Sequence, residues 1–149
     1  MRRKDRERTD AGFFDEVFSA AEVLFLAFNT GEAPYCLPVN FAREGEHIYI
    51  HCAPEGLKLD CVRRDDRVAF SCAVDVVIDR AHSSTYYRSL CGTGRARIVD
   101  AMEEKRHALD CIGERYARCP RPTPEATARR VTILRIDIRT LTGKQAVAG

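Results

Sequence analysis

A lysine at the start of a predicted helix is the residue with the clearest potential for chemistry. Residues 48–52 alternate as a strand does, Pro54 and Gly56 interrupt the pattern, and helical spacing begins at Leu57. A helix start leaves backbone N–H groups unpaired and carries partial positive charge, so Lys58 in the first turn would complete a site for a phosphate. An ordinary strand-to-helix connection with a solvated lysine would have the same pattern, and Lys58 alone does not separate the two.

A neighbouring histidine and cysteine look like a nucleophile and its base, but strand geometry separates them. Successive side chains of a strand point to opposite faces, so His51 and Cys52 cannot form the hydrogen bond that such a pair needs. The seven cysteines are odd in number and have no Cys-x-x-Cys spacing, which disfavours a disulfide framework and a zinc ribbon. We therefore expect no metal site and reduced, mostly buried thiols, with small core roles for Cys61, Cys72 and Cys111.

The segment 35–41 is the most informative of the predicted strands. Its alternation places Asn40 on the polar face with Cys36 and Pro38, while the other face is apolar and consists of Tyr35, Leu37, Val39 and Phe41. Because Pro38 has no N–H to donate to a neighbouring strand, this strand should lie at a sheet edge or a bulge. A ligand or a partner subunit could approach it there.

Further strands complete a predicted antiparallel sheet. They are expected over residues 23–28, buried on both faces, and over residues 48–52, 68–78, 86–99 and 131–138. Gly92 and Gly94 within the fourth of these mark a bulge, a bend or the close approach of another group to the backbone. The first strands are joined by hairpin turns rather than helical crossovers, which favours an antiparallel barrel.

Helices are predicted before and between the strands of the sequence. Apolar spacing indicates one over residues 14–21, capped by Asp10 or Asp15, and a short one from Leu57 that should bury Leu57, Cys61 and Val62. The longest follows Asp100, which would form a capping box with Glu103 and bury Met102, Leu109, Ile112 and Tyr116. A short helix is expected over residues 125–130.

Length and composition indicate one globular domain, residues 1–149, with residues 1–10 as a frayed basic terminus. The chain is 45% hydrophobic and 31% charged, and its longest uncharged apolar run is too short to cross a bilayer. No apolar segment of a secretory signal follows the basic start, so a cytoplasmic location is expected. The net charge of +2 is too small to indicate a nucleic-acid surface.

Four segments in this order resemble the pyridoxamine 5'-phosphate oxidase-like split β-barrel family, most closely the branch of nitroimidazole-resistance (Nim) proteins. The segments are Tyr35–Phe41, Ile48–Lys58, Tyr87–Ala96, and Arg135–Ile138 with Leu141–Lys144. The resemblance implies a mainly β fold, a six-stranded antiparallel split β-barrel with peripheral helices. It also implies a homodimer that binds flavin mononucleotide (FMN) between the subunits.

The resemblance also implies which residues hold the cofactor. Pro38, Val39 and Asn40 would run beside the isoalloxazine ring, and His51, Cys52 and Ala53 would surround the ribityl chain and the phosphate. Lys58 would pair with the phosphate, which agrees with the anion site inferred from the residues themselves. Arg88 and Ser89 would reach the cofactor from the other subunit, with Gly92 and Gly94 giving it room.

Several of these residues have a plain structural alternative. His51 could be a histidine bonded to main chain, and Asn40 and Ser89 could satisfy a barrel rim or a neighbouring strand. Cys52 stands where the family often has a hydroxyl residue, and the chain has no tryptophan, so phosphate affinity could be lower and any indole near the ring is absent.

Two functions therefore follow as hypotheses. The first is an FMN-dependent oxidoreductase that passes electrons from a reduced donor to a small acceptor, conceivably a nitroaromatic, without a proton-relay triad or an identifiable catalytic residue. The alternative is a non-catalytic flavin- or haem-binding module on the same fold. No nucleic-acid or membrane partner is expected.

Overall fold

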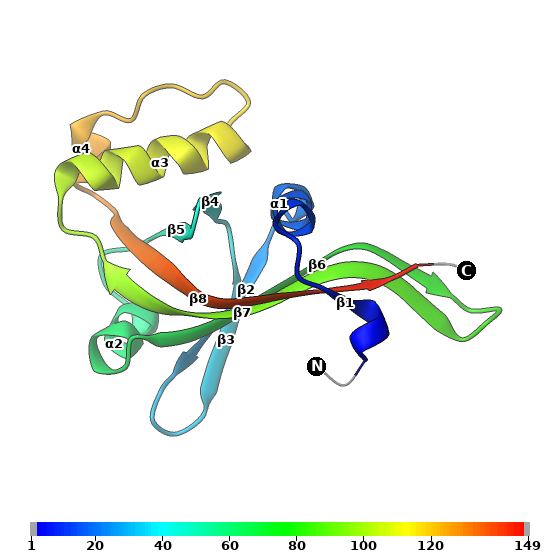
Figure 1. Ribbon diagram of the computed structural model, residues 1–149. Coiled ribbons are helices and arrows are strands. Elements are labelled where there is room, and N and C mark those ends of the chain that lie inside the picture. Colours follow the sequence, from blue (N-terminus) through cyan, green and yellow to red (C-terminus); the bar gives the residue numbers. More distant parts are fainter. Residues whose placement is uncertain (1–2, 148–149) are drawn as a thin grey trace.

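Most of the chain pairs into one antiparallel sheet with the strand order β3-β2-β6-β7-β8-β5-β4, in a computed structural model that describes residues 3–147 (Figure 1). The strands are β1 (Glu7–Arg8), β2 (Leu24–Asn29), β3 (Pro34–Val39), β4 (Ala42–Glu44), β5 (His47–Cys52), β6 (Arg67–Asp79), β7 (Ser84–Ile98) and β8 (Thr132–Ala146). The helices are η1 (Lys4–Arg6), α1 (Ala11–Ala20), α2 (Leu57–Arg64), α3 (Met102–Tyr116) and α4 (Glu125–Ala128).

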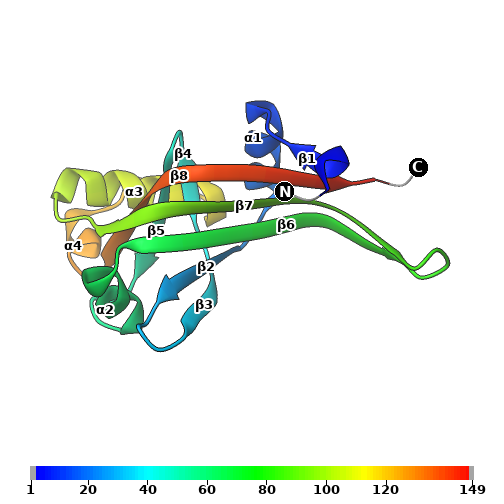
Figure 2. The ribbon, with the colours of Figure 1, turned by 60° about the horizontal axis from the view of Figure 1, so that its bottom comes forward.

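The predicted fold class, a mainly β antiparallel split barrel, is confirmed. The six expected strands correspond to β2, β3, β5, β6, β7 and β8, while β1 and β4 are short additions. The last strand was expected to end at residue 138, but it continues to Ala146 because β7 pairs with it along its whole length. The long strands β6 and β7 run together beyond the body of the molecule and end in a hairpin (Figure 2).

The main core lies between the sheet and α1. Its fully buried members include Val17, Leu24, Leu26, Ile48, Ile50, Leu134 and Ile136. Asp10 caps α1 as predicted, because its Oδ1 accepts a hydrogen bond of 2.9 Å from the backbone N–H of Phe13. The expectation that strand 23–28 is buried on both faces is wrong, since Phe25 is 52% exposed and only the alternate residues enter the core.

A second core fills the space between α3 and the strands β4, β5 and β8. It consists of Ala42, Tyr49, Val99, Ala108, Ile112 and Ile133. The predicted capping box is wrong, because α3 starts after Ala101 without any side-chain cap. Of the residues expected to face inward, Tyr116 is 38% exposed, and Ala108 takes an inner position instead.

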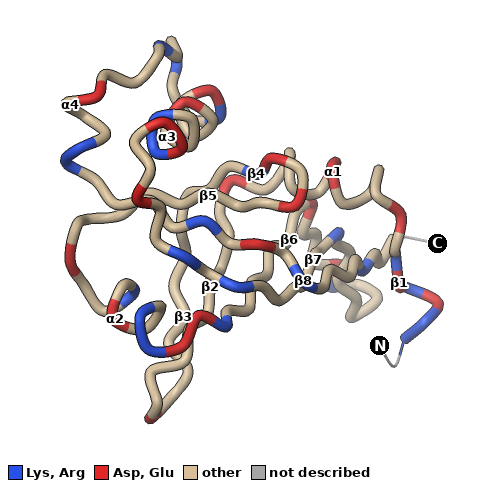
Figure 3. The backbone as a smooth tube through the Cα atoms, turned by 60° about the vertical axis from the view of Figure 1, so that its left-hand side comes forward, with Lys and Arg blue, Asp and Glu red and all other residues tan. Residues whose placement is uncertain are grey.

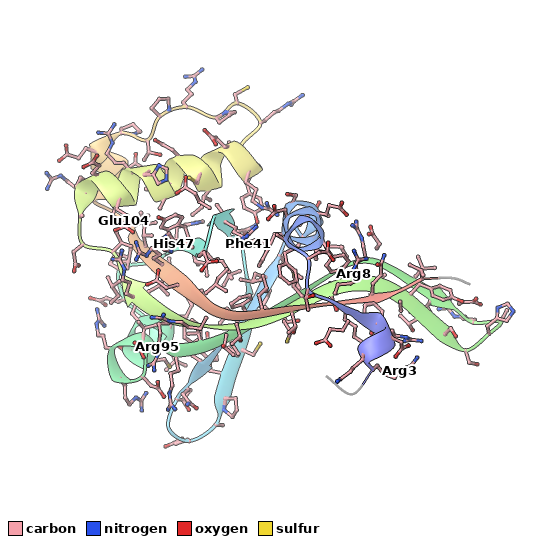
Figure 4. All side chains as sticks on the ribbon, viewed as in Figure 1. Arg3, Arg8, Phe41, His47, Arg95 and Glu104 are labelled. Carbon is pink, nitrogen blue, oxygen red and sulfur yellow. The ribbon has the colours of Figure 1, made fainter. Side chains whose placement is uncertain are left out.

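Glu104 holds the first turn of α3 to the sheet in place of a cap. Its carboxylate accepts hydrogen bonds of 2.9 and 3.0 Å from Arg97 on β7 and Arg135 on β8. Burial opposes ionisation of this carboxyl, but the two arginines outweigh it and lower the pKa of Glu104. Figure 4 places Glu104 at the end of α3 that meets the sheet.

Replacing Glu104 with glutamine should therefore lower the free energy of unfolding by about 1 kcal/mol at pH 7. A lowered pKa in the folded state stabilises the protein above the unfolded pKa of 4.5, and this contribution disappears as the pH falls through the folded value. Urea unfolding at pH 7 and at about pH 3 should show the difference between the two proteins shrinking in acid. An equal difference at both pH values would contradict this account.

The glycines of β7 face other parts of the same chain. A Cβ on Gly92 would lie 2.4 Å from the ring of Phe70 and 2.6 Å from the carbonyl oxygen of Thr140. A Cβ on Gly94 would lie 2.6 Å from the side chain of Ile136, next to a register shift between β7 and β8. The predicted bulge and the close approach of other groups to Gly92 and Gly94 are thus present. The groups that approach are side chains and backbone of the same chain, whereas the resemblance had suggested the cofactor.

Part of the basic start of the chain pairs with the sheet. Glu7 and Arg8 pair with Lys144 and Gly143 of β8, and Arg8 donates to the side-chain oxygen of Gln145 over 2.5 Å. Residues 1–2 of the expected frayed segment 1–10 lie outside the described residues. Within residues 3–147, every helix is too short or too polar to span a lipid bilayer.

Candidate functional site

The loop between β5 and α2 forms the best candidate for an anion site. Gly56 is the N-cap of α2 and provides no side-chain cap, so the first-turn N–H groups have no such partner. Its φ of +138° is accessible only to glycine, and this conformation turns the strand into the helix. Lys58 follows in the first turn, half-buried.

The inner face of α2 fixes the position of this loop. Leu59, Cys61 and Val62 are buried against the main core, whereas Leu57 is 49% exposed. The prediction that Leu57 faces inward is therefore wrong, and Leu59 takes that place. Because α2 is anchored on one side only, its first turn and Lys58 stay accessible from solvent.

Cys52 lies at the end of β5, close to Lys58. Burial raises the pKa of the Cys52 thiol, and the charge of Lys58 only partly opposes this effect. Cys52 is therefore a neutral thiol at pH 7, a weak hydrogen-bond donor that adds no negative charge beside Lys58. Ala53 follows Cys52 in the chain and is exposed. Since the charge of Lys58 acts on the Cys52 thiol, the predicted residues Cys52, Ala53 and Lys58 belong to the same loop region.

The side chain of His51 lies on the other face of β5. It shares the face of Tyr49, and its partner in β8 is Ile133 of the second core. His51 is exposed there, while Cys52 belongs to the side of the main core. The predicted separation of His51 from Cys52 is thus confirmed. From this face the imidazole is not directed toward Lys58, and only the backbone of His51 belongs to the loop.

The strand β3 is an edge strand, as Pro38 predicted. Among residues 3–147 it pairs with β2 alone, with Pro38 opposite Phe25. Pro38 and Asn40 are exposed, while Val39 is half-buried against the main core. One edge of β3 and its polar face are therefore open to a ligand or to another chain.

Arg88 and Ser89 lie on opposite faces of β7. Arg88 donates hydrogen bonds of 2.6 Å to Asp75 and 2.9 Å to Glu16 on α1. Asp75 has a φ of +52° within a bulge of β6, which brings its carboxylate to Arg88. Ser89 lies between Ala73 and Lys144 on the outer face of the sheet. The structure therefore does not bring these two predicted residues to one site, and the charge of Arg88 is already neutralised.

The outer face of the sheet is the feature that the site predictions missed. Small or uncharged residues form two cross-strand rows there, Pro38–Phe25–Ser71–Cys91–Thr142 and Cys36–Ala27–Ala69–Thr93–Thr140. A groove of about 530 Å³ includes Ala27, Ala69 and Thr93 of the second row and is also lined by Arg67, Arg95 and Arg139. A second groove, of about 440 Å³, includes Phe25 and Ser71 of the first row. In Figure 3 the β2–β3 hairpin carries charge only near its tip. In β6 and β7, small residues alternate along the strand with the residues that enter the core. This alternation is the sequence signal that could have indicated the outer surface.

Comparisons with known proteins agree with this fold. The family model described as pyridoxamine 5'-phosphate oxidase matches residues 10–145. A protein of Bacteroides thetaiotaomicron, provisionally assigned as a 5-nitroimidazole antibiotic resistance protein, has 27% identity and a TM-score of 0.82, covering 93% of this chain and 85% of its own. No curated protein is detectably similar.

Two further structures share the fold at lower identity. The FAD and haem binding protein of Mycobacterium smegmatis has 20% identity and a TM-score of 0.83, over 96% of this chain and 74% of its own. A FAD-binding protein of Mesorhizobium loti has 20% identity and a TM-score of 0.70, over 95% of this chain and 99% of its own. Because the family model spans nearly all of the described fold, the chain belongs to the pyridoxamine 5'-phosphate oxidase family.

Proposed function

We propose that the protein is a homodimeric flavoprotein that binds FMN and acts as an oxidoreductase. The observation that carries the proposal is the start of α2, where a glycine N-cap leaves the first turn uncapped and Lys58 stands beside a neutral thiol. Such a turn accepts a phosphate through backbone N–H groups, and a lysine adds a full charge. The FAD-binding neighbours on the same fold support a flavin as the source of that phosphate.

The edge strand β3 is the surface that would take the isoalloxazine ring. Its free edge offers backbone groups, and Pro38 leaves one position without an N–H donor, so a flat ring can approach closely. Asn40, exposed just after the strand, can offer both a donor and an acceptor to polar ring atoms. These groups would orient the ring while the α2 turn holds the phosphate.

The outer face of the sheet is the surface that would receive a second copy. Two rows of residues on this face carry no charge, and Phe25 is 52% exposed there. Exposed uncharged sheet surface next to an open edge is a common basis for association. Ser89 and Lys144 lie on this face, so the partner can contribute them, whereas Arg88 stays with Asp75 and Glu16.

Thiol reactivity offers a direct test of this dimer. Cys36 and Cys91 lie in the two rows of the outer face, while Cys119 is exposed outside them. In a dimer, Ellman's reagent should modify Cys119 rapidly and the other two slowly. Cys72 is buried and its pKa is raised to about 11, mainly by burial, so it should not react in the folded protein. Equal fast reaction of Cys36, Cys91 and Cys119 would contradict the interface.

The proposed oxidoreductase role rests on the chemistry of the proposed cofactor. When bound, FMN supplies electron transfer between a reduced donor and a small acceptor. The chain binds the phosphate at α2, orients the ring along β3 and shields one side of it with the partner. A nitroaromatic acceptor is supported by the 5-nitroimidazole resistance assignment of the Bacteroides neighbour.

The first experiment is the visible absorbance of the freshly purified protein, followed by acid release and chromatography of the bound group. A yellow protein that releases FMN supports the proposal. FAD in its place would correct the cofactor, and a Soret band would favour the second candidate, a haem-binding module, for which the mycobacterial FAD and haem binding protein is the precedent. A colourless protein that takes up no FMN would overturn the flavin assignment.

Turnover is tested separately. NAD(P)H oxidation is followed with the FMN-loaded protein and a nitroaromatic acceptor, with the same concentration of free FMN as the control. A rate above that of free FMN supports the enzyme. An FMN-bound protein that never exceeds the control would favour a binding module without turnover.

A further inference from the structure

Three side chains that can bind a metal converge between β4 and α3, apart from the residues assigned to flavin. The Nε2 atom of His107 lies 2.8 Å from Oε2 of Glu44 and 3.6 Å from Sγ of Cys111. All three ligand atoms lie within 4.8 Å of one another. A carboxylate oxygen, an imidazole nitrogen and a sulfur therefore surround one small volume.

The separation between the nitrogen and the sulfur matches that around a tetrahedral ion. Zinc with Zn–N of about 2.05 Å and Zn–S of about 2.3 Å holds the nitrogen and the sulfur about 3.6 Å apart. The same geometry needs about 3.3 Å between nitrogen and oxygen, so the Glu44 carboxylate has to move by about half an ångström. The Glu44 side chain is 53% exposed, which leaves it free to do so.

The helix that carries His107 and Cys111 is packed against the second core. His107 and Cys111 are four residues apart on α3 and thus share a helix face, and their neighbours Ala108 and Ile112 are buried in the second core. The ring of Tyr49 packs edge-on against the His107 imidazole, with centroids 6.1 Å apart at 89°. Figure 1 shows α3 lying along β4 and β5, the arrangement that brings Glu44 to the helix.

The local charge favours a cation. The carboxylates of Glu44, Asp110 and Glu114 lie near the Cys111 thiol. A divalent ion would offset these negative charges and ionise the thiol on binding it. Mixed nitrogen, sulfur and oxygen ligands suit zinc and its neighbours in the first transition row better than calcium or magnesium, which select oxygen alone.

We propose that Glu44, His107 and Cys111 form a binding site for a divalent transition-metal ion of the zinc class, with a fourth position open to solvent. Three protein ligands and an accessible fourth position describe an open site rather than a closed structural one. The ion would also join the edge strand β4 to α3.

Cobalt(II) is the probe that tests this site, because its thiolate complexes absorb strongly and its tetrahedral complexes are coloured. The reduced, chelator-treated, untagged full-length protein is titrated with Co²⁺. One equivalent should produce a thiolate-to-cobalt charge-transfer band and visible bands, and Zn²⁺ should abolish them. In Cys111→Ser the charge-transfer band should disappear and the affinity fall at least tenfold; His107→Asn should lower the affinity similarly.

Cys119→Ser is the matched control, since it removes an exposed thiol outside the cluster. Its spectrum and affinity should equal those of the unaltered protein. The proposal is overturned if Cys111→Ser keeps the charge-transfer band, or if the unaltered protein shows none with one equivalent of Co²⁺. As a second measurement, Zn²⁺ should raise the melting temperature of the unaltered protein clearly more than that of Cys111→Ser at the same concentration.

Discussion

Replacement of Lys58 by methionine is expected to weaken FMN binding by about ten- to a hundredfold, the effect of losing one charge-assisted bond to a phosphate. Methionine keeps the length and helix propensity of the side chain and removes its charge. The neutral Cys52 thiol and the backbone N–H groups of α2 would remain, so binding should weaken rather than vanish. Fluorescence titration of the flavin-free protein with FMN measures the change.

Arg63→Met on the same helix is the matched control. Arg63 is exposed and pairs with Asp60 over 3.1 Å, so its loss removes a charge from α2 without touching the first turn. Its FMN affinity should stay within about twofold of the original, because a distant exposed charge is screened by solvent. If both variants lose the same FMN affinity, Lys58 acts only through the overall charge of α2 and not through a direct bond to the phosphate. Undiminished FMN affinity in Lys58→Met would exclude the α2 turn as the phosphate site.

Strand periodicity carried most of the fold prediction because β2, β3, β6 and β7 alternate between a more buried and a more exposed face, although β5 and β8 bury residues on both faces. The alternation in segment 35–41 and the missing N–H of Pro38 were enough to place β3 at an edge. The same reasoning failed for residues 23–28, because an apolar run does not distinguish a strand buried on both faces from one with an exposed outer face. Phe25 lies on such an exposed face.

Local patterns located the α2 turn but not the partners that come from distant segments. Arg88 was interpreted as a cofactor contact because the sequence does not show that Asp75, at a bulge of β6, and Glu16, on α1, lie beside it. These two carboxylates neutralise the charge of Arg88. The capping box failed for a similar reason, since Glu104 binds arginines of β7 and β8. The cluster of Glu44, His107 and Cys111 was missed because only two of its members are close in sequence.

Replacement of Gly92 by alanine is expected to lower the free energy of unfolding by about 3 kcal/mol and the melting temperature by roughly 10 °C, even without flavin. The new methyl group would lie 2.4 Å from the Phe70 ring and 2.6 Å from the carbonyl oxygen of Thr140. The ring is buried and the carbonyl is backbone, so neither can yield without moving the core or the β7–β8 pairing. Urea unfolding of the flavin-free protein measures the loss.

Gly113→Ala supplies the opposite expectation on the same chain. Gly113 lies inside α3 with nothing within 4 Å of an added Cβ, so alanine should raise the free energy of unfolding by about 0.5–1 kcal/mol. These measurements distinguish the two roles considered for Gly92, which are packing against the core and giving room to the cofactor. If Gly92→Ala lowers the free energy of unfolding without flavin, Gly92 is needed for the packing of Phe70 against β7. If its stability is unchanged but its FMN affinity falls, Gly92 is needed for cofactor binding. The close contacts with Phe70 and Thr140 favour the first outcome, because they exist within the single chain and need no ligand.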